Sequence, residues 1–186
     1  MTASPYIAVV GGVNIDIGGR SDAPLVAGDS NPGRIRSSLG GVGRNIAHNL
    51  CLLGQQVSMV TVLGQDSFAQ SVRDNAAAIG LDLSHSAVIP GGRTGTYLFI
   101  AGSDGDMALA VNDMAIYDHI TPDFLRQRLE FINRAGLVVV ETNLPEASIQ
   151  WLCSHCTAPV LADPVSTIKA PKLLPVLDKL TALKPN

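Results

Sequence analysis

The sequence has few charged residues and few aromatic residues. Charged side chains make up 16% and aromatic side chains 4% of the 186 residues, whereas hydrophobic residues make up 46%. Soluble domains carry about 25% charged residues, so either the chain folds around a buried sheet or part of its surface is covered by something outside this sequence. Because apolar content is high and charge is low, intrinsic disorder is excluded.

An excess of positive charge is also absent. Lys and Arg number 13 against 16 Asp and Glu, which gives a net charge of −3 without any basic run. Nucleic-acid binding needs a basic patch, so we expect no nucleic-acid partner. No apolar run reaches the ~18 residues of a membrane-spanning helix, so we expect no membrane partner. The N-terminus lacks the basic start of a secretory signal, and the expected location is the cytoplasm.

Cysteine and histidine are too sparse and too poorly spaced for a disulfide framework or a metal site. The sequence has 3 cysteines, of which Cys153 and Cys156 are close together and Cys51 is alone. A structural zinc site needs four ligands, normally two such pairs. None of the 4 histidines is four residues from another, so the spacing of helical zinc motifs is missing. We therefore assign no metal ligands.

Apolar runs alternate with helical stretches, which is typical of parallel βα units. The pattern predicts one α/β domain with a mostly parallel sheet and no linker, and a polar, Gly- and Pro-bearing stretch at residues 18–33. The predicted strands are residues 6–10, 34–39, 57–63, 94–101, 107–111, 137–140, 159–162 and 181–183. The predicted helices are residues 40–53, 66–80, 121–134, 145–153 and 171–177.

Polar side chains follow four of the predicted strands, at the point where each strand ends. In open α/β sheets, ligands bind outside the carboxyl ends of the strands. Any single polar residue there could instead cap the next helix, but repetition at four strand ends favours a binding site. The residues are Asn14, Asp16, Glu141, Asn143, Asp163 and Asn186.

A second candidate element is the glycine-rich segment that opens the helix predicted at residues 40–53. Gly40, Gly41 and Gly43 let the backbone approach a ligand, although a tight turn would use the same residues. The helix start offers unpaired N–H groups and the positive end of the helix dipole. Asn45, one turn further, offers a donor and an acceptor to a hydroxyl group. No Walker lysine and no G-x-G-x-x-G directly after a strand is present, which argues against a Rossmann-type oxidoreductase.

Three motifs carry a resemblance to a known family. The stretch G-G-V-G-R-N-I-A at residues 40–47, followed by Gly54 and Gly64, resembles the first signature of the PfkB (ribokinase-like) carbohydrate kinases. V-G-G-V-N-I-D at residues 10–16 resembles that family's sugar-binding start, and K-P-N at residues 184–186 resembles the beginning of its Asn-x-x-Glu motif. The resemblance implies a ribokinase-like fold with a small β-lid, formed by segments of about 18–39 and 94–112. It also implies that residues 1–186 are the N-terminal part of one such domain, with the C-terminal part missing.

The resemblance also implies an activity. The family transfers the γ-phosphate of ATP, with Mg²⁺, to a hydroxyl group of a sugar or nucleoside. Residues 29–33, 40–47, 112–114 and 163–166 resemble most the members that phosphorylate the 5′-hydroxyl of pseudouridine. By this resemblance, Asp163 and Asn186 lie toward the ATP and magnesium side, and a homodimer forms through the lid. The implied substrate-binding residues are Asn14, Asp16, Gly40, Gly41, Asn45, Glu141 and Asn143.

One part of the family pattern is absent from the sequence. The family's catalytic aspartate lies in a Gly-Ala-Gly-Asp motif, which these residues do not contain, so we assign no catalytic residue. A general base alone contributes about 10²–10⁴ in rate. We therefore expect that residues 1–186 alone do not phosphorylate a substrate at a useful rate and do not bind ATP and Mg²⁺ well. The alternatives are another sugar or nucleoside kinase of the ribokinase type, or a non-catalytic remnant that binds a nucleoside or only dimerises.

Overall fold

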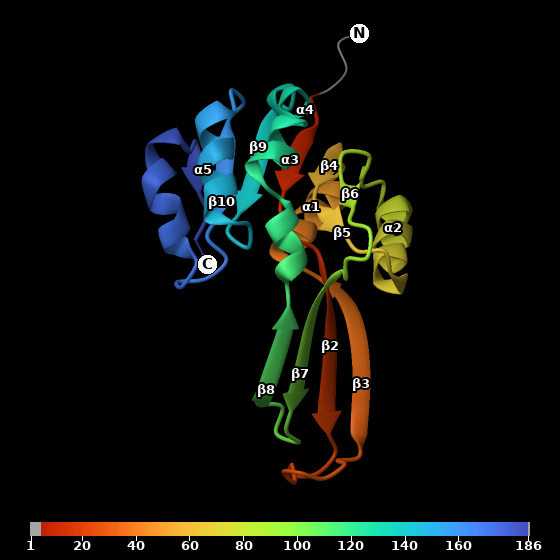
Figure 1. Ribbon diagram of the computed structural model, residues 1–186. Coiled ribbons are helices and arrows are strands. Elements are labelled where there is room, and N and C mark those ends of the chain that lie inside the picture. The colour runs from red at the N-terminus through yellow and green to blue at the C-terminus, as the bar shows by residue number, and fades with distance from the viewer. Residues whose placement is uncertain (1–4, 186) are drawn as a thin grey trace.

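The chain forms two sheets, a larger one between helices and a smaller one that extends away from it (Figure 1). A computed structural model describes residues 5–185. The larger sheet has five strands in the order β11-β10-β9-β1-β4, and all of its pairings are parallel. The predicted mostly parallel α/β fold is therefore confirmed. The strands are β1 (Ile7–Val10), β4 (Val57–Val60), β9 (Leu137–Glu141), β10 (Val160–Asp163) and β11 (Ala182–Leu183).

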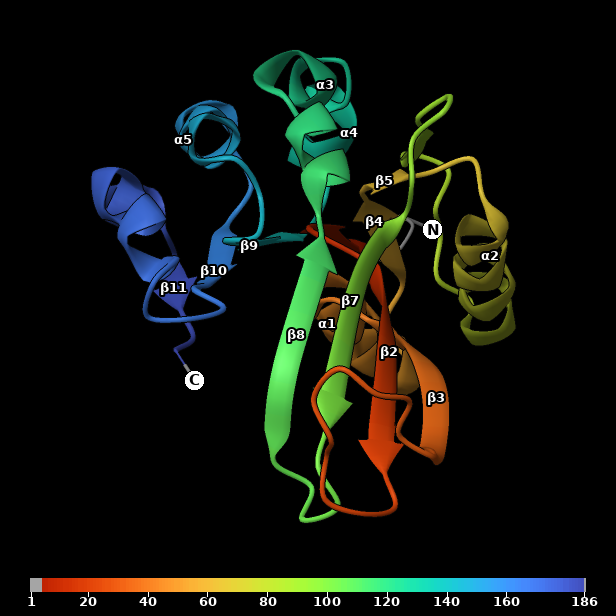
Figure 2. The same ribbon diagram turned by 60° about the horizontal axis from the view of Figure 1, so that its bottom comes forward.

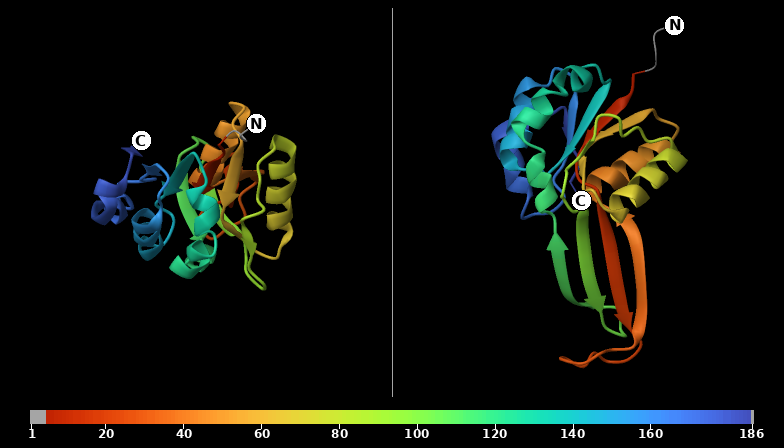
Figure 3. Two further views of the ribbon diagram at one scale, coloured as in Figure 1. Left: turned by 90° about the horizontal axis from the view of Figure 1, so that it is seen from above. Right: turned by 45° about the vertical axis from the view of Figure 1, so that its right-hand side comes forward.

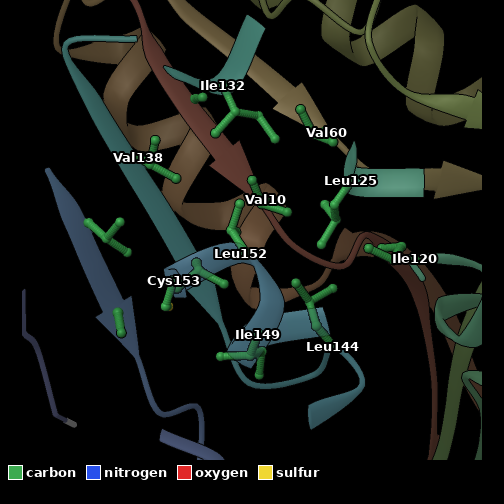
Figure 4. Close-up of a cluster of buried hydrophobic side chains, with 14 of the residues drawn as sticks. Val10, Val60, Ile120, Leu125, Ile132, Val138, Leu144, Ile149, Leu152 and Cys153 are labelled. Atoms are coloured by element: carbon green, nitrogen blue, oxygen red, sulfur yellow. The ribbon is translucent and has the colours of Figure 1, made fainter. Parts of the chain in front are cut away.

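Helices cover both faces of the five-stranded sheet, as the right-hand view of Figure 3 shows. Side chains alternate along β1, so Val9 packs with α1 and α2 on one face while Ala8 and Val10 pack into the cluster on the other (Figure 4). Burial of apolar strands on both faces is the main stabilising contribution of such a sheet. The first face carries α1 (Val42–Leu52) and α2 (Ser67–Ile79); the second carries η1 (Ala115–His119), α3 (Pro122–Arg126), α4 (Leu129–Asn133), α5 (Glu146–His155) and η2 (Ala170–Lys179).

Four strands form the smaller sheet, which we call the appended sheet (Figure 2). Their order is β3-β2-β7-β8, with β2 parallel to β7 and the two outer pairs antiparallel. The register places Asp16 opposite Tyr97 and Gly18 opposite Phe99, so these residues share one face, the Asp16 face. The strands are β2 (Asn14–Ser21), β3 (Gly33–Gly40), β7 (Gly95–Ala101) and β8 (Met107–Asp113).

Three local predictions differ from the structure. Residues 18–21 belong to β2, whereas the sequence pattern predicts an irregular polar stretch there. The strand predicted at 57–63 ends at Val60, and a separate β5 (Val62–Leu63) pairs with β6 (Ala87–Val88). The helix predicted at 121–134 is divided into α3 and α4. In residues 5–185, no helix combines the length and the apolar character that crossing a bilayer would require.

Candidate functional site

The carboxyl ends of β1, β9 and β10 lie next to one another. Val10 is opposite Val140, and Glu141 is opposite Asp163 in the strand register. After β1 the chain turns through Gly11 and passes between Glu141 and the start of α1. A Cβ at position 11 would lie 2.9 Å from Cγ of Glu141 and 3.0 Å from Cα of Gly43. Only glycine fits this approach, and it brings the glycine-rich segment to the ends of the strands.

Glu141 connects the loops that follow β1 and β9. Its side chain is fully buried. Oε1 accepts a hydrogen bond from the backbone N–H of Gly12 at 2.8 Å, and Oε2 accepts one from the N–H of Asn143 at 2.9 Å. Burial raises the pKa of Glu141, while these two N–H groups and the nearby Lys169 oppose the rise. Nζ of Lys169 in turn donates to Oδ1 of Asn143. Glu141 and Asn143 therefore belong to one hydrogen-bonded group.

Asn14 and Asp16 form a second group at the start of the appended sheet. Nδ2 of Asn14 donates to Oδ1 of Asp16 at 2.6 Å. The carboxylate of Asp16 lies over Gly40, where any Cβ would collide with it. Gly41 follows with φ +94°, a conformation that favours glycine, and a Cβ there would lie 2.6 Å from the carbonyl oxygen of Gly12. The structure thus brings together Asn14, Asp16, Gly40 and Gly41.

Of the two residues expected toward ATP and magnesium, the structure describes Asp163 but not Asn186. Asp163 is 5% exposed at the end of β10, where Oδ1 accepts from the N–H of Val165 at 2.8 Å and Oδ2 lies 3.7 Å from Nζ of Lys184. Asn186 lies outside the described residues. Across residues 5–185, no three or more His, Cys, Asp or Glu side chains are grouped to hold a metal ion.

A cavity of about 620 Å³ lies along the Asp16 face of the appended sheet, and we call it the sheet hollow. Of the predicted site residues, Asp16 lines it. Sequence reasoning missed the other side chains that shape it, although alternation along residues 34–38 was the available signal. They include Arg20, Arg34, Arg36, Ser38 and Phe99.

Tyr117 is a further residue that sequence reasoning missed, because no motif marks it. It is 4% exposed, and Cβ atoms built at Gly12 and Gly95 would lie 2.8 Å and 3.0 Å from its hydroxyl oxygen. Burial raises the pKa of Tyr117, and the charges of Glu141 and Asp16 raise it further. Within residues 5–185 its hydroxyl has no hydrogen-bond partner. The ring fills the junction between the two sheets, next to both groups of site residues.

The fold is similar to that of carbohydrate kinases of known structure. A carbohydrate kinase from Agrobacterium tumefaciens superposes with a TM-score of 0.88 at 31% identity, covering 97% of this chain and 60% of that one. Residues 4–186 match the pfkB family carbohydrate kinases, and the chain belongs to this family.

Two curated relatives are members of this family whose sequences are similar to this chain. Pseudouridine kinase of Escherichia coli (strain K12) is 38% identical over 100% of this chain, which covers 60% of that protein. Ribokinase of Bacillus subtilis (strain 168) is 28% identical over 97% of this chain and 61% of its own length. The chain thus spans about three fifths of the length of these relatives.

Proposed function

We propose that the grouped residues bind the ribose of a nucleoside, and that this chain serves the ATP- and Mg²⁺-dependent phosphorylation of the 5′-hydroxyl of pseudouridine. The identity of 38% to a pseudouridine kinase, against 28% to a ribokinase, supports this assignment over phosphorylation of free ribose. The chain's own residues would bind and orient the nucleoside. ATP would supply the phosphoryl group.

The pair formed by Asp16 and Asn14 is the observation on which the proposal rests. A carboxylate accepts hydrogen bonds from hydroxyl groups, and each charge-assisted bond contributes about 1.5–3 kcal/mol. Asn14 already donates to Oδ1 of Asp16 and holds the carboxylate in place. Because position 40 is glycine, no side chain at that position covers Oδ2 of Asp16. A ribose at the end of the sheet hollow would therefore donate its hydroxyl protons to Asp16.

The sheet hollow supports a nucleoside over a free sugar. From Asp16 it continues to Phe99, whose ring covers Gly18, and to Arg36, which is opposite Gly18 in the strand register. An aromatic ring offers a surface for a planar base, and a guanidinium group donates to carbonyl oxygens. A base attached to the ribose would occupy this part of the hollow, whereas free ribose would fill only the end at Asp16.

Asp163 is proposed to act toward the phosphate and magnesium side, together with Asn186. Because both carboxylate oxygens of Asp163 already face partners in the chain, its interaction with a magnesium ion would pass through water. Mg²⁺ keeps several of its waters when it binds to proteins.

Calorimetric titration of the full chain with pseudouridine, uridine and ribose tests the proposal. We expect pseudouridine to bind most tightly, because a site that pairs the extra N–H of its base leaves an acceptor unpaired with uridine. Asp16→Asn should weaken pseudouridine binding about 10- to 100-fold, which corresponds to losing one charge-assisted bond. Asp74→Asn, on the exposed face of α2, is the matched control and should leave the affinity unchanged.

Two outcomes would contradict different parts of the proposal. Equal affinities for the three ligands would reject pseudouridine as the substrate and favour a broader kinase of the ribokinase type. Folded protein without affinity for any of them would reject the ribose site. Turnover is a separate readout: with Mg²⁺-ATP we expect none from residues 1–186, and measured turnover would overturn that expectation.

A further inference from the structure

We infer that Arg44 is a positioning residue, which orients the amide of Asn45 so that its N–H groups point away from the protein and toward the substrate. The inference rests on the proposed function only in placing Asn45 beside a ribose. The orientation of the amide follows from the contacts of Arg44 itself.

Arg44 lies in the first turn of α1, where three parts of the chain meet. Its side chain is 9% exposed. Nη1 donates to the carbonyl oxygen of Leu39 at 3.4 Å and to Oδ1 of Asn45 at 3.1 Å, and Nη2 donates to Oδ1 of Asn75 at 2.7 Å. The guanidinium group therefore connects the end of β3, the start of α1 and the middle of α2.

No carboxylate within residues 5–185 forms an ion pair with this guanidinium group. Its acceptors are neutral oxygens, and its Nε has no hydrogen-bond partner in the same part of the chain. Burial lowers the pKa of Arg44. Removing a cation from water without an opposite charge costs free energy, and an apolar side chain would fill the same space without that cost. What the guanidinium provides here is a fixed fork of donors for two side-chain amides.

The donors of Arg44 determine which way the amide of Asn45 faces. Arginine has no acceptor, so the oxygen of the Asn45 amide must face it. The Nδ2 group then points in the opposite direction, and the Asn45 side chain is exposed. From sequence, Asn45 could offer either a donor or an acceptor; held by Arg44, it offers donors. Asp16 offers only acceptors when ionised, so a sugar hydroxyl would donate to Asp16, whereas it would accept from Asn45.

The first test measures the amide directly. In side-chain NMR of the full chain, the NH₂ group of Asn45 should be ordered, and Arg44→Met should make it markedly more mobile because the methionine has no donor. Asn75→Ala removes one anchor of the guanidinium group and should have a smaller effect in the same direction. Arg134→Met, at an exposed position on the surface, should change nothing. Unchanged order in Arg44→Met would overturn the inference.

The second test measures binding of pseudouridine by calorimetry. Arg44→Met should weaken the affinity about 10-fold, the loss of roughly one neutral hydrogen bond, and Arg44→Lys should restore part of it. Asn45→Asp should keep or raise the melting temperature, since the new carboxylate pairs with Arg44, yet weaken binding at least as much because the donors are gone. Wild-type affinity in folded Asn45→Asp would show that the amide donors are not used.

The two tests separate failure of the inference from failure of the proposed function. A mobile Asn45 amide in Arg44→Met, in a chain that binds none of the ligands, supports the positioning role and rejects the ribose site. If Arg44→Met does not fold, Asn75→Ala decides with the same two readouts, and Arg44→Lys serves as the variant that keeps a donor. An ordered Asn45 amide with wild-type affinity in Asn75→Ala overturns the inference.

Discussion

At the scale of single residues, Glu141 shows how a buried charge organises the site. Its two oxygens accept the N–H groups of Gly12 and Asn143, which belong to loops 129 and 2 residues away in sequence. The loop after β1 leads into β2 at Asn14, which donates to Asp16. The loop after β9 contains Asn143, whose Oδ1 accepts from Lys169. The carboxylate therefore has a clear positioning role, while its contact with a substrate remains a proposal.

The ionisation of Glu141 is expected to destabilise the folded chain. Because burial raises the folded pKa of Glu141 above 4.5, the free energy of unfolding should fall as the pH rises from about that value toward the folded pKa. The loss is about 1.36 kcal/mol for each unit by which the two pKa values differ. Glu141→Gln lacks this titration, so the wild-type protein should lose stability relative to the variant over that range.

Urea unfolding of both proteins at several pH values measures this difference. Other acids titrate in both proteins and cancel when the two curves are subtracted. If the wild-type value minus the variant value stays flat with pH, the N–H groups of Gly12 and Asn143 balance the burial of the carboxylate; if it rises with pH, they outweigh it. Either result contradicts the prediction.

At the scale of elements, the junction between β3 and α1 depends on close backbone contacts. Gly41 has φ +94°, and a Cβ there would lie 2.6 Å from the carbonyl oxygen of Gly12. Gly54, after α1, also has a positive φ of +77°, but a Cβ there would meet nothing within 4 Å. The two positions therefore separate the cost of backbone conformation from the cost of a steric clash.

Replacing these glycines by alanine should have unequal effects. Gly54→Ala should cost about 1 kcal/mol of unfolding free energy, the strain of a left-handed residue. Gly41→Ala should cost about 3 kcal/mol or more, because strain and a clash with backbone atoms add. Thermal and urea unfolding measure both values. Equal costs would mean that the loop at Gly12 moves aside, and that the close approach is not needed.

At the scale of the whole molecule, the appended sheet exposes an apolar surface on the face opposite Asp16. Leu98 is 40%, Leu109 61% and Val111 59% exposed, and the register places Leu98 opposite Val111. Ile35, 80% exposed, joins them across Gly19. Exposed apolar patches of this kind indicate association. A second copy of the chain, packed through this sheet, is the proposed partner.

Sedimentation at micromolar concentration tests the proposed dimer. The wild-type chain should sediment as a dimer, and the double variant Leu109→Asp with Val111→Asp as a monomer, since each added charge would be buried without a partner. Leu174→Asp, an exposed position on η2, should leave the dimer intact. A monomeric wild-type chain would count against the dimer while leaving the ribose site untouched.

Much of the body of the fold is readable from local patterns. The apolar runs that became β1, β9 and β10, and the Asp66 cap of α2, follow from periodicity and capping, which neighbouring residues determine. The polar strand ends follow from the same patterns, since each lies directly after an apolar run. Residues 18–21 could not be recognised as strand, because their strand pairing is with β3 and with β7, whose Phe99 is about eighty positions away from Gly18.

By itself, the sequence determined the parallel α/β body, the glycine-rich helix start and the family to which the chain belongs. Only the tertiary structure decided which face of β2 carries Asp16 beside the hollow, that both oxygens of Glu141 accept backbone N–H groups, and which way Arg44 turns the amide of Asn45. The physical reason is that secondary structure follows from spacing along the chain, whereas hydrogen-bond direction and burial depend on groups that meet only after folding.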